Sequence, residues 1–211
     1  MIDRNVLRLV AALLLMVCAW AAQSKPFVPA DDALVLERLP LKATDPVARE
    51  LGELRTRLAA EPANSALAAT LARRYFRLAM AEGDPRYIGY GEAALRSWWS
   101  RADAPLDVIK MRALLKQYKH DFAGALADFA VAGEGNPSDE EIWSWRAALH
   151  IVQADYAAAT SDCAMLKRHA SALAWTSCQS WVDGMTGRAS LAYAALADAH
   201  EMPELDQQPQ S

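Results

Sequence analysis

The sequence predicts an all-α fold made of stacked helical hairpins, and three observations support this prediction. The octapeptide DFAGALAD at residues 121–128 recurs 34 residues later as DYAAATSD at residues 155–162. The agreement extends beyond this window, because Arg112 and Arg146 stand at the same offset, as do Ala113 and Ala147. The chain is rich in Ala and Leu and has only 9 glycines, a composition that favours helices over a β-sandwich. A fixed period of this length indicates helix pairs that must stack, since one pair cannot bury its apolar face alone.

Residues 1–23 are expected to form a secretory signal peptide. Arg4 and Arg8 lie near the start, an apolar run covers residues 9–22, and residues 19–21 fit a small-x-small cleavage site ending at Ala21. The apolar run is shorter than the roughly 20 residues that span a bilayer, so an uncleaved anchor is the less favoured alternative. Val17 directly before Cys18 disfavours lipid attachment. We therefore expect a periplasmic or secreted protein with no stable membrane insertion after cleavage.

The charge of the expected mature chain argues against a nucleic-acid partner. Cleavage after Ala21 removes Asp3, Arg4 and Arg8 from the 22 basic and 26 acidic residues, which leaves 20 and 25 and a net charge of −5. A chain with this balance does not attract phosphate groups by its overall charge. The sequence also lacks a nucleotide-binding glycine loop and a zinc-protease signature.

The first helix is predicted after a linker. Residues 24–44 contain Pro26, Pro29 and Pro40 and lack a sustained helical period, so we expect an extended segment there. Asp45 and Pro46 then have the order of a helix N-cap followed by a proline in the first turn. Leucines continue at helical spacing to about residue 60, so this helix is predicted to cap the array.

The first hairpin is predicted to have an unusual connection. Its first helix carries Leu71 and Tyr75, and its second carries residues 93–95 and ends near Trp98 and Trp99. Between them, the glycine-rich segment 83–91 is predicted to replace the usual short turn with an unusually long connection. Asp84 and Pro85 in this segment fit the cap of a second helix, and its glycines permit close backbone approach.

Three further hairpins follow at about the same period. Their helix pairs are expected around residues 109–116 and 122–132, 143–150 and 156–166, and 175–187 and 192–199. The helical repeat domain is thus predicted to cover residues 45–200, and the polar tail 201–211 is expected to be disordered.

This pattern resembles the tetratricopeptide repeat family, and in particular its small exported bacterial members. The resemblance covers residues 46–199 and is strongest in the two repeats that contain Arg112 and Arg146. It implies a right-handed superhelix of about three to four hairpins, whose first helices line a concave groove that binds another polypeptide. The long connection and Ser171, which stands where a proline is usual, depart from the family pattern.

Carrying the family's groove over to this chain places ten candidate binding residues on the first helices. Arginine and lysine can bind carboxylates and aromatic side chains supply flat contact area, so this mixture suits a peptide with acidic and apolar groups. The clamp that chaperone-binding members use for a C-terminal carboxylate is not expected, because Leu114 and Ala148 stand at its positions. The candidates are Arg73, Phe76, Arg77, Lys110, Leu114, Gln117, Tyr118, Ser144, Ile151 and Trp181.

The connection at residues 83–91 provides a second set of candidates. Asp84, Arg86, Tyr87 and Tyr90 are polar or aromatic, and loops on rigid scaffolds often carry function. The interpretation that we prefer is structural: Asp84 caps the next helix, Arg86 pairs with a carboxylate and the tyrosines pack.

Cys163 and Cys178 remain after signal cleavage, and a disulfide between them is the simplest interpretation in an oxidising compartment. They fall on the second helix of one repeat and the first helix of the next, which the family's stacking brings into contact. A metal site that also uses His169 and His200 is the alternative, although no recognised ligand spacing supports it.

Other repeated residues are assigned structural roles. Asp121 and Asp155 precede second helices and are predicted to be N-caps, and Arg112 and Arg146 recur on one helix face. No nucleophile has a plausible base nearby in the pattern, so no catalytic residue and no cofactor are expected.

Two functions follow from these observations. The leading prediction is a non-enzymatic exported adaptor that binds a protein or peptide segment in its groove. The alternative is a metal-handling or thiol-redox protein that uses Cys163 and Cys178.

Overall fold

The computed structural model describes residues 28–31, 34 and 45–201. The chain divides into two units, residues 1–42 and residues 43–211. The few described residues of the first unit form no helix or strand. The predicted signal peptide, almost all of the predicted linker and residues 202–211 of the tail lie outside the described residues.

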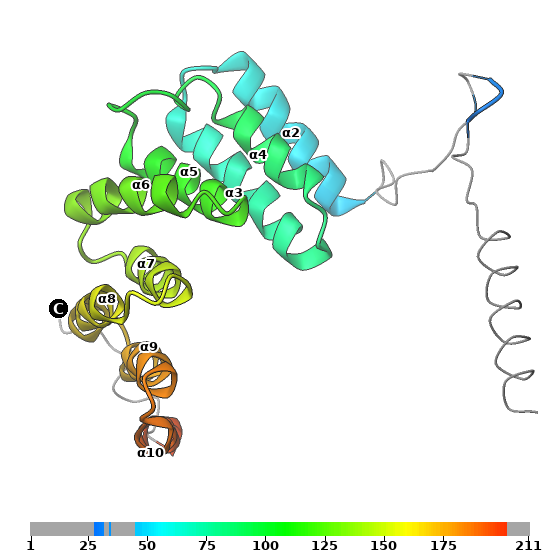
Figure 1. Cartoon of the computed structure of the whole chain (residues 1–211). Helices are drawn as coiled ribbons and strands as arrows, with labels where there is room; N and C mark the ends of the chain where they lie inside the picture. The colour runs from blue at the N-terminus through cyan, green and yellow to red at the C-terminus, as the bar shows by residue number, and fades with distance from the viewer. Residues whose placement is uncertain (1–27, 32–33, 35–44, 202–211) are drawn as a thin grey trace, which may run out of the picture. The chain divides into compact units, whose positions relative to one another are not determined.

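The described part of the second unit is entirely helical, which confirms the predicted fold class (Figure 1). None of its helices is long and apolar enough to cross a membrane. In chain order the helices are α2 (Pro46–Ala60), α3 (Ser65–Glu82), α4 (Arg86–Ala94), α5 (Leu106–Tyr118), α6 (Phe122–Gly135), α7 (Glu140–Val152), α8 (Tyr156–His169), α9 (Ala172–Met185) and α10 (Ala189–Glu201).

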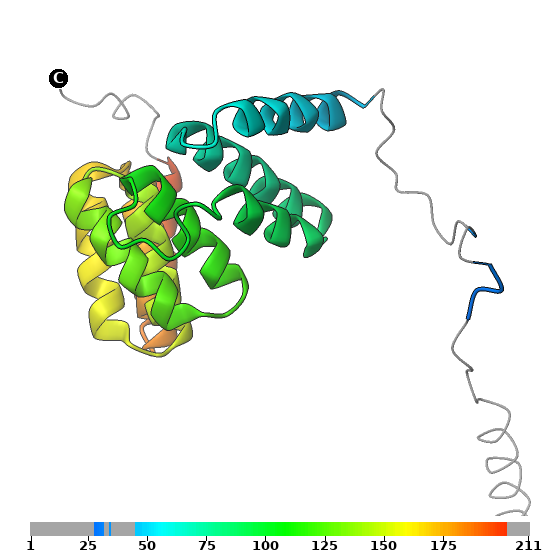
Figure 2. The same cartoon turned by 90° about the horizontal axis from the view of Figure 1, so that it is seen from above.

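The helices pack as four hairpins: α3 with α4, α5 with α6, α7 with α8, and α9 with α10. The first helix of each later hairpin also contacts the second helix of the preceding hairpin, and α3 contacts α2 in the same way. In addition α3 contacts α5, and α7 contacts α9. Figure 2 shows the hairpins from α5 to α10 stacked one behind another. This is the stacking that the repeat period predicts.

Small residues at repeated positions let the helices approach closely. Ala113 and Ala147 occupy equivalent places on α5 and α7, and both are at most 1% exposed. Ala125 and Ala159 do the same on α6 and α8, and both are fully buried. A larger side chain at these places would force the neighbouring helix away, because protein interiors are close-packed.

Three aspartates cap their helices as predicted. Asp45 Oδ1 accepts a hydrogen bond from the Val47 amide at 2.7 Å. Asp121 and Asp155 accept from the amides three residues further on, at 3.0 and 3.1 Å. Each carboxylate satisfies an amide that has no partner within the helix, and its charge favours the positive end of the helix dipole.

The predicted long connection at residues 83–91 was wrong. Helix α3 ends at Glu82, Gly83 adopts the left-handed conformation with φ of 69°, and α4 already begins at Arg86. The glycines inside α4 mark a close contact and do not break the helix: a Cβ added to Gly91 would lie 3.0 Å from the Leu115 side chain. Helix α4 also ends at Ala94, earlier than predicted, and turns continue to residue 100.

Candidate functional site

A hollow of about 400 Å³ lies between α2, α3 and α5. It brings together three of the predicted groove residues, Arg73 and Arg77 on α3 and Lys110 on α5. Arg74 also lines it, and the acidic residues of its lining are Glu50 and Asp107. The lining thus contains four cations, whose ion pairs decide which of them can bind an acidic ligand. We call it the α3–α5 hollow.

Two of these cations are held by the N-terminus of α7. Arg73 Nη1 donates to Glu141 Oε1 at 2.8 Å, and Lys110 Nζ lies 3.2 Å from Glu141 Oε2. Lys110 Nζ also donates to Asp139, the N-cap of α7. Burial alone would raise the pKa of Glu141, but the hydrogen bond and charge of Arg73, together with Lys110, outweigh it and hold that pKa below its ordinary value. The ionised Glu141 therefore fixes Arg73 and Lys110 in place.

Arg77 differs from these two residues because it has no ion pair within the described part of the chain. It lies one helical turn beyond Arg73, and its side chain is exposed at the edge of the α3–α5 hollow. Its neighbour Arg74 is occupied, since its Nε lies 2.8 Å from Glu50 Oε2. Arg77 is thus the guanidinium available to a carboxylate that enters the hollow.

A second, smaller hollow of about 220 Å³ lies between α7, α8 and α9. It joins two further predicted residues, Ser144 on α7 and Trp181 on α9. Trp181 is 49% exposed, which is unusual for so large an apolar side chain. We call this the α7–α9 hollow, and its remaining lining is small and mostly apolar: Ala147, Ala148, Leu166, Ala174, Ser177 and Cys178.

The other groove candidates lie elsewhere. Gln117 and Tyr118 are half-buried near the end of α5 and line neither hollow. Placing Phe76 on the groove surface was wrong: it is 6% exposed and packs edge-on against Trp145, with ring centroids 6.3 Å apart. Leu114 and Ile151, at 0% and 4% exposed, are core residues as well.

Asp84 lies in the turn after α3, whereas Arg86, Tyr87 and Tyr90 lie in α4 and not in a free loop. The N-cap of α4 is Pro85, so Asp84 is not the cap that we preferred. Asp84 Oδ1 accepts from the Arg86 amide at 2.9 Å, and the Arg86 guanidinium lies 2.7 Å from Asp84 Oδ2. The hydrogen bonds from Arg86 lower the pKa of Asp84. Tyr87 is buried and stacks on Tyr75, whereas Tyr90 is half exposed.

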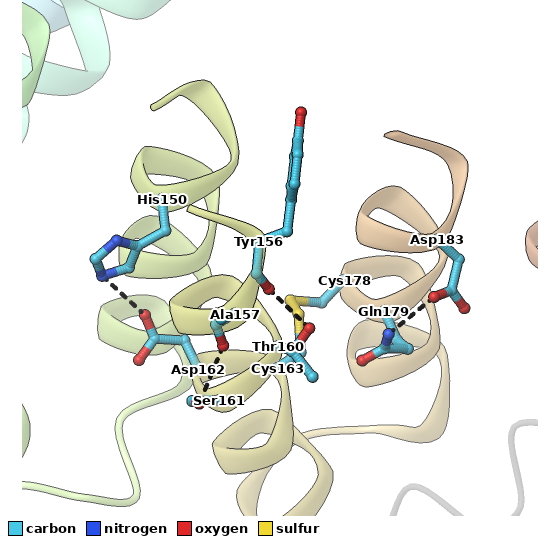
Figure 3. Close-up of a disulfide and its surroundings, with 10 residues drawn as sticks. All are labelled: His150, Tyr156, Ala157, Thr160, Ser161, Asp162, Cys163, Cys178, Gln179 and Asp183. Atoms are coloured by element: carbon cyan, nitrogen blue, oxygen red, sulfur yellow. Dashed lines mark hydrogen bonds and ion pairs between the residues drawn. A yellow bond between two sulfur atoms is a disulfide. The ribbon is translucent and has the colours of Figure 1, made fainter. Parts of the chain in front are cut away.

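Cys163 on α8 and Cys178 on α9 form a disulfide, as the sequence predicted (Figure 3). Cys163 is 1% exposed and occupies the repeat position that Phe129 fills one repeat earlier. A covalent link thus stands where the preceding repeat uses an aromatic side chain. The described residues contain no group of three or more His, Cys, Asp or Glu side chains that could hold a metal ion.

Sequence reasoning missed a buried ionic network centred on Asp128 of α6. The Arg112 guanidinium donates to both carboxylate oxygens, at 2.6 and 2.8 Å, and Lys116 Nζ donates to Oδ2 at 2.7 Å. Arg112 Nη1 also donates to the carbonyls of Trp98, Trp99 and Arg101, so it fixes the chain that follows α4. The signal was present, because Asp128 closes the repeated octapeptide and Arg112 belongs to the same repeat.

The same network recurs one repeat later in a weaker form. Arg146 Nη2 lies 3.2 Å from Asp162 Oδ1. His150 occupies the repeat position of Lys116, and its Nε2 lies 3.6 Å from Asp162 Oδ2 (Figure 3). Asp162 Oδ2 and Arg146 Nε are buried and have no hydrogen-bond partner within the described residues. Burial raises the pKa of Asp162, although the charges of Arg146 and His150 oppose the shift.

This raised pKa predicts how stability depends on pH. Folded Asp162 keeps its proton to a higher pH than the unfolded chain, whose carboxyl titrates near 3.8, so the ionised group opposes folding at neutral pH. That cost disappears as the pH falls through the folded pKa. We therefore expect the stability of wild type to rise relative to that of Asp162→Asn between about pH 7 and pH 4, measured by urea unfolding. A stability difference that stays constant, or moves the other way, would contradict this assignment.

Comparison with known proteins supports the fold. No protein-family model matches the chain, and no curated protein matches it. The crystal structure of a tetratricopeptide repeat protein from Parabacteroides merdae is similar, with a TM-score of 0.58 and 18% sequence identity. The match covers 75% of this chain and 62% of that one, so the chain spans less than two thirds of its relative. This chain therefore has the tetratricopeptide repeat fold, a solenoid of stacked helical hairpins.

Proposed function

We propose that the protein is an exported, non-enzymatic adaptor that holds a segment of a partner polypeptide along its first helices. The observation that carries this proposal is Arg77, an exposed guanidinium without an ion pair among the described residues, in the lining of the α3–α5 hollow. Export rests on the signal-like residues 1–23. The absence of a catalytic role is the expectation drawn from the sequence and the fold.

The two hollows suggest the chemistry of the partner segment. An Asp or Glu side chain would pair with Arg77, whereas Arg73 and Lys110 are already paired with Glu141. An apolar or aromatic residue would cover Trp181 in the α7–α9 hollow. Both hollows lie on the row of first helices, so one extended segment with acidic and apolar positions is the ligand that the adaptor is proposed to hold.

A peptide-display selection tests this proposal. We expect enriched peptides to carry an acidic residue, and Arg77→Ala to weaken their binding roughly tenfold or more, because it removes a charge-assisted hydrogen bond. Trp181→Ala should also weaken binding, as the loss of an exposed aromatic anchor does at other interfaces. Affinities are measured by calorimetry on variants whose circular dichroism matches wild type.

The matched control is Arg57→Ala, since Arg57 is exposed on α2 and lines neither hollow. It should bind the selected peptides as wild type does. If Arg77→Ala and Trp181→Ala also bind like wild type, the peptide site is not on the first helices and the proposal fails.

A further inference from the structure

A third hollow, of about 370 Å³, lies between α2, α3 and α4 and is separate from both hollows assigned to the peptide. Its walls are mainly apolar: Leu58, Ala59, Pro62, Leu71, Ala93 and Ala94. Its volume is in the range of small-ligand pockets. Because α4 ends at Ala94, Arg96 and Ser97 fall in the turns that follow and form part of its rim.

The polar groups of this hollow are cationic or neutral. Arg55 on α2 and Arg96 after α4 both line it, and both are exposed. Neither forms an ion pair with any described residue, and the lining contains no Asp or Glu. In the described structure Arg73 and Arg74 are paired with carboxylates, whereas Arg77, like Arg55 and Arg96, is not. Two guanidinium groups beside an apolar surface that contains no acidic residue suit a ligand with an anionic group and an apolar body.

Tyr75 adds a hydroxyl group to the polar lining of this hollow. It is 3% exposed, lines the hollow, and lies 5.5 Å from the ring of Tyr90, another lining residue. Within the described part of the chain, its hydroxyl has no hydrogen-bond partner. The hydroxyl oxygen is not among the described buried polar atoms that lack a partner, so it is accessible to solvent, and a polar group of a ligand in the hollow could replace water there.

We propose that this hollow binds a small apolar carboxylate. Its apolar body would cover Leu58, Leu71 and the alanines, and its carboxylate would pair with Arg55 and Arg96. The chemistry is shared by a medium-chain fatty acid and by the apolar C-terminal residue of a peptide. The site lies on different elements from the α7–α9 hollow, and it shares no residue with the α3–α5 hollow.

Calorimetric titration of the whole secreted protein with octanoate, below its micellar concentration, tests this site. Octanamide has the same chain without the charge and should bind at least about tenfold more weakly, since it cannot form the charge-assisted bonds. Arg55→Ala and Arg96→Ala should each lower the affinity for octanoate about tenfold, and Tyr75→Phe should lower it by a smaller factor. N-acetylphenylalanine, titrated in parallel, distinguishes a peptide C-terminus from a fatty acid as the tighter source of the carboxylate.

Arg49→Ala is the matched control, because Arg49 is exposed on the same helix as Arg55 but does not line the hollow. It should leave octanoate binding unchanged, and so should Arg77→Ala, which keeps this test independent of the peptide groove. The proposal is overturned if neither carboxylate binds, if octanamide binds as tightly as octanoate, or if the Arg55 and Arg96 variants bind like wild type.

Discussion

Asp128→Asn is expected to lower the free energy of unfolding by about 3–5 kcal/mol, the largest effect of any single change considered for this chain. Asp128 is 6% exposed and accepts three hydrogen bonds from Arg112 and Lys116. Removing its charge would leave the buried Arg112 and the partly buried Lys116 without a counterion. Arg112, which also holds the chain after α4, would lose its orientation. Urea unfolding monitored by tryptophan fluorescence measures the loss.

The repeat supplies the matched control for this prediction. Asp162 occupies the equivalent position, but its contacts with Arg146 and His150 are longer and one of its oxygens lacks a hydrogen bond. We therefore expect Asp162→Asn to cost much less than Asp128→Asn at neutral pH. Equal losses in the two variants would show that the geometry of these networks does not decide their stability.

Loss of the Cys163–Cys178 disulfide is expected to lower stability by about 3 kcal/mol. The bond joins residues 15 apart and ties α8 to α9, so it restricts the unfolded chain and secures the last hairpin. The measurement compares the urea midpoint of the oxidised protein with that of Cys163→Ala/Cys178→Ala. Alanine is the appropriate replacement, because Cys163 is buried and a serine hydroxyl would introduce a second penalty.

Reduced wild-type protein is the control for the volume lost in the alanine variant. It should resemble the double variant in stability, apart from the small cavity that the alanines leave. If reduction, checked by thiol titration, leaves the midpoint unchanged, the disulfide does not contribute to the stability of this hairpin.

The central repeats could be predicted from the sequence because their information is local. The octapeptide that recurs after 34 residues places Asp121 and Asp155 directly before α6 and α8, and it keeps Ala125 and Ala159 on the buried faces. Capping and close packing depend on neighbours in sequence or in the same hairpin. The register of α5 to α8 therefore follows from the residues alone.

The connection between α3 and α4 could not be predicted from the same reasoning, because its glycines serve a distant contact. Gly91 is inside α4 and meets Leu115 on α5, 24 residues away in sequence, so a rule that treats glycine as a helix breaker misreads it. The placement of Phe76 on the groove surface was wrong for a related reason. Its partner Trp145 lies on α7, and nothing in the local sequence pattern indicates that pairing.

The candidate groove was predicted in part. Arg73, Arg77 and Lys110 do meet at one hollow, and Ser144 meets Trp181 at another. The sequence did not show that Arg73 binds Glu141, 68 residues away. It therefore could not distinguish the ion-paired cations from Arg77, which has no ion pair among the described residues. That separation depends on tertiary contacts between α3 and α7.

Site-specific photo-crosslinking in the producing cells tests most directly whether the first helices hold the partner. Benzoylphenylalanine is placed at Thr70 in the α3–α5 hollow, at Ser144 in the α7–α9 hollow, and at exposed Thr160 on the second helix α8. We predict that one partner is captured from positions 70 and 144 but not from 160, and that Arg77→Ala abolishes its capture. Capture of that partner from position 160 alone, or capture that survives Arg77→Ala, would contradict groove recognition.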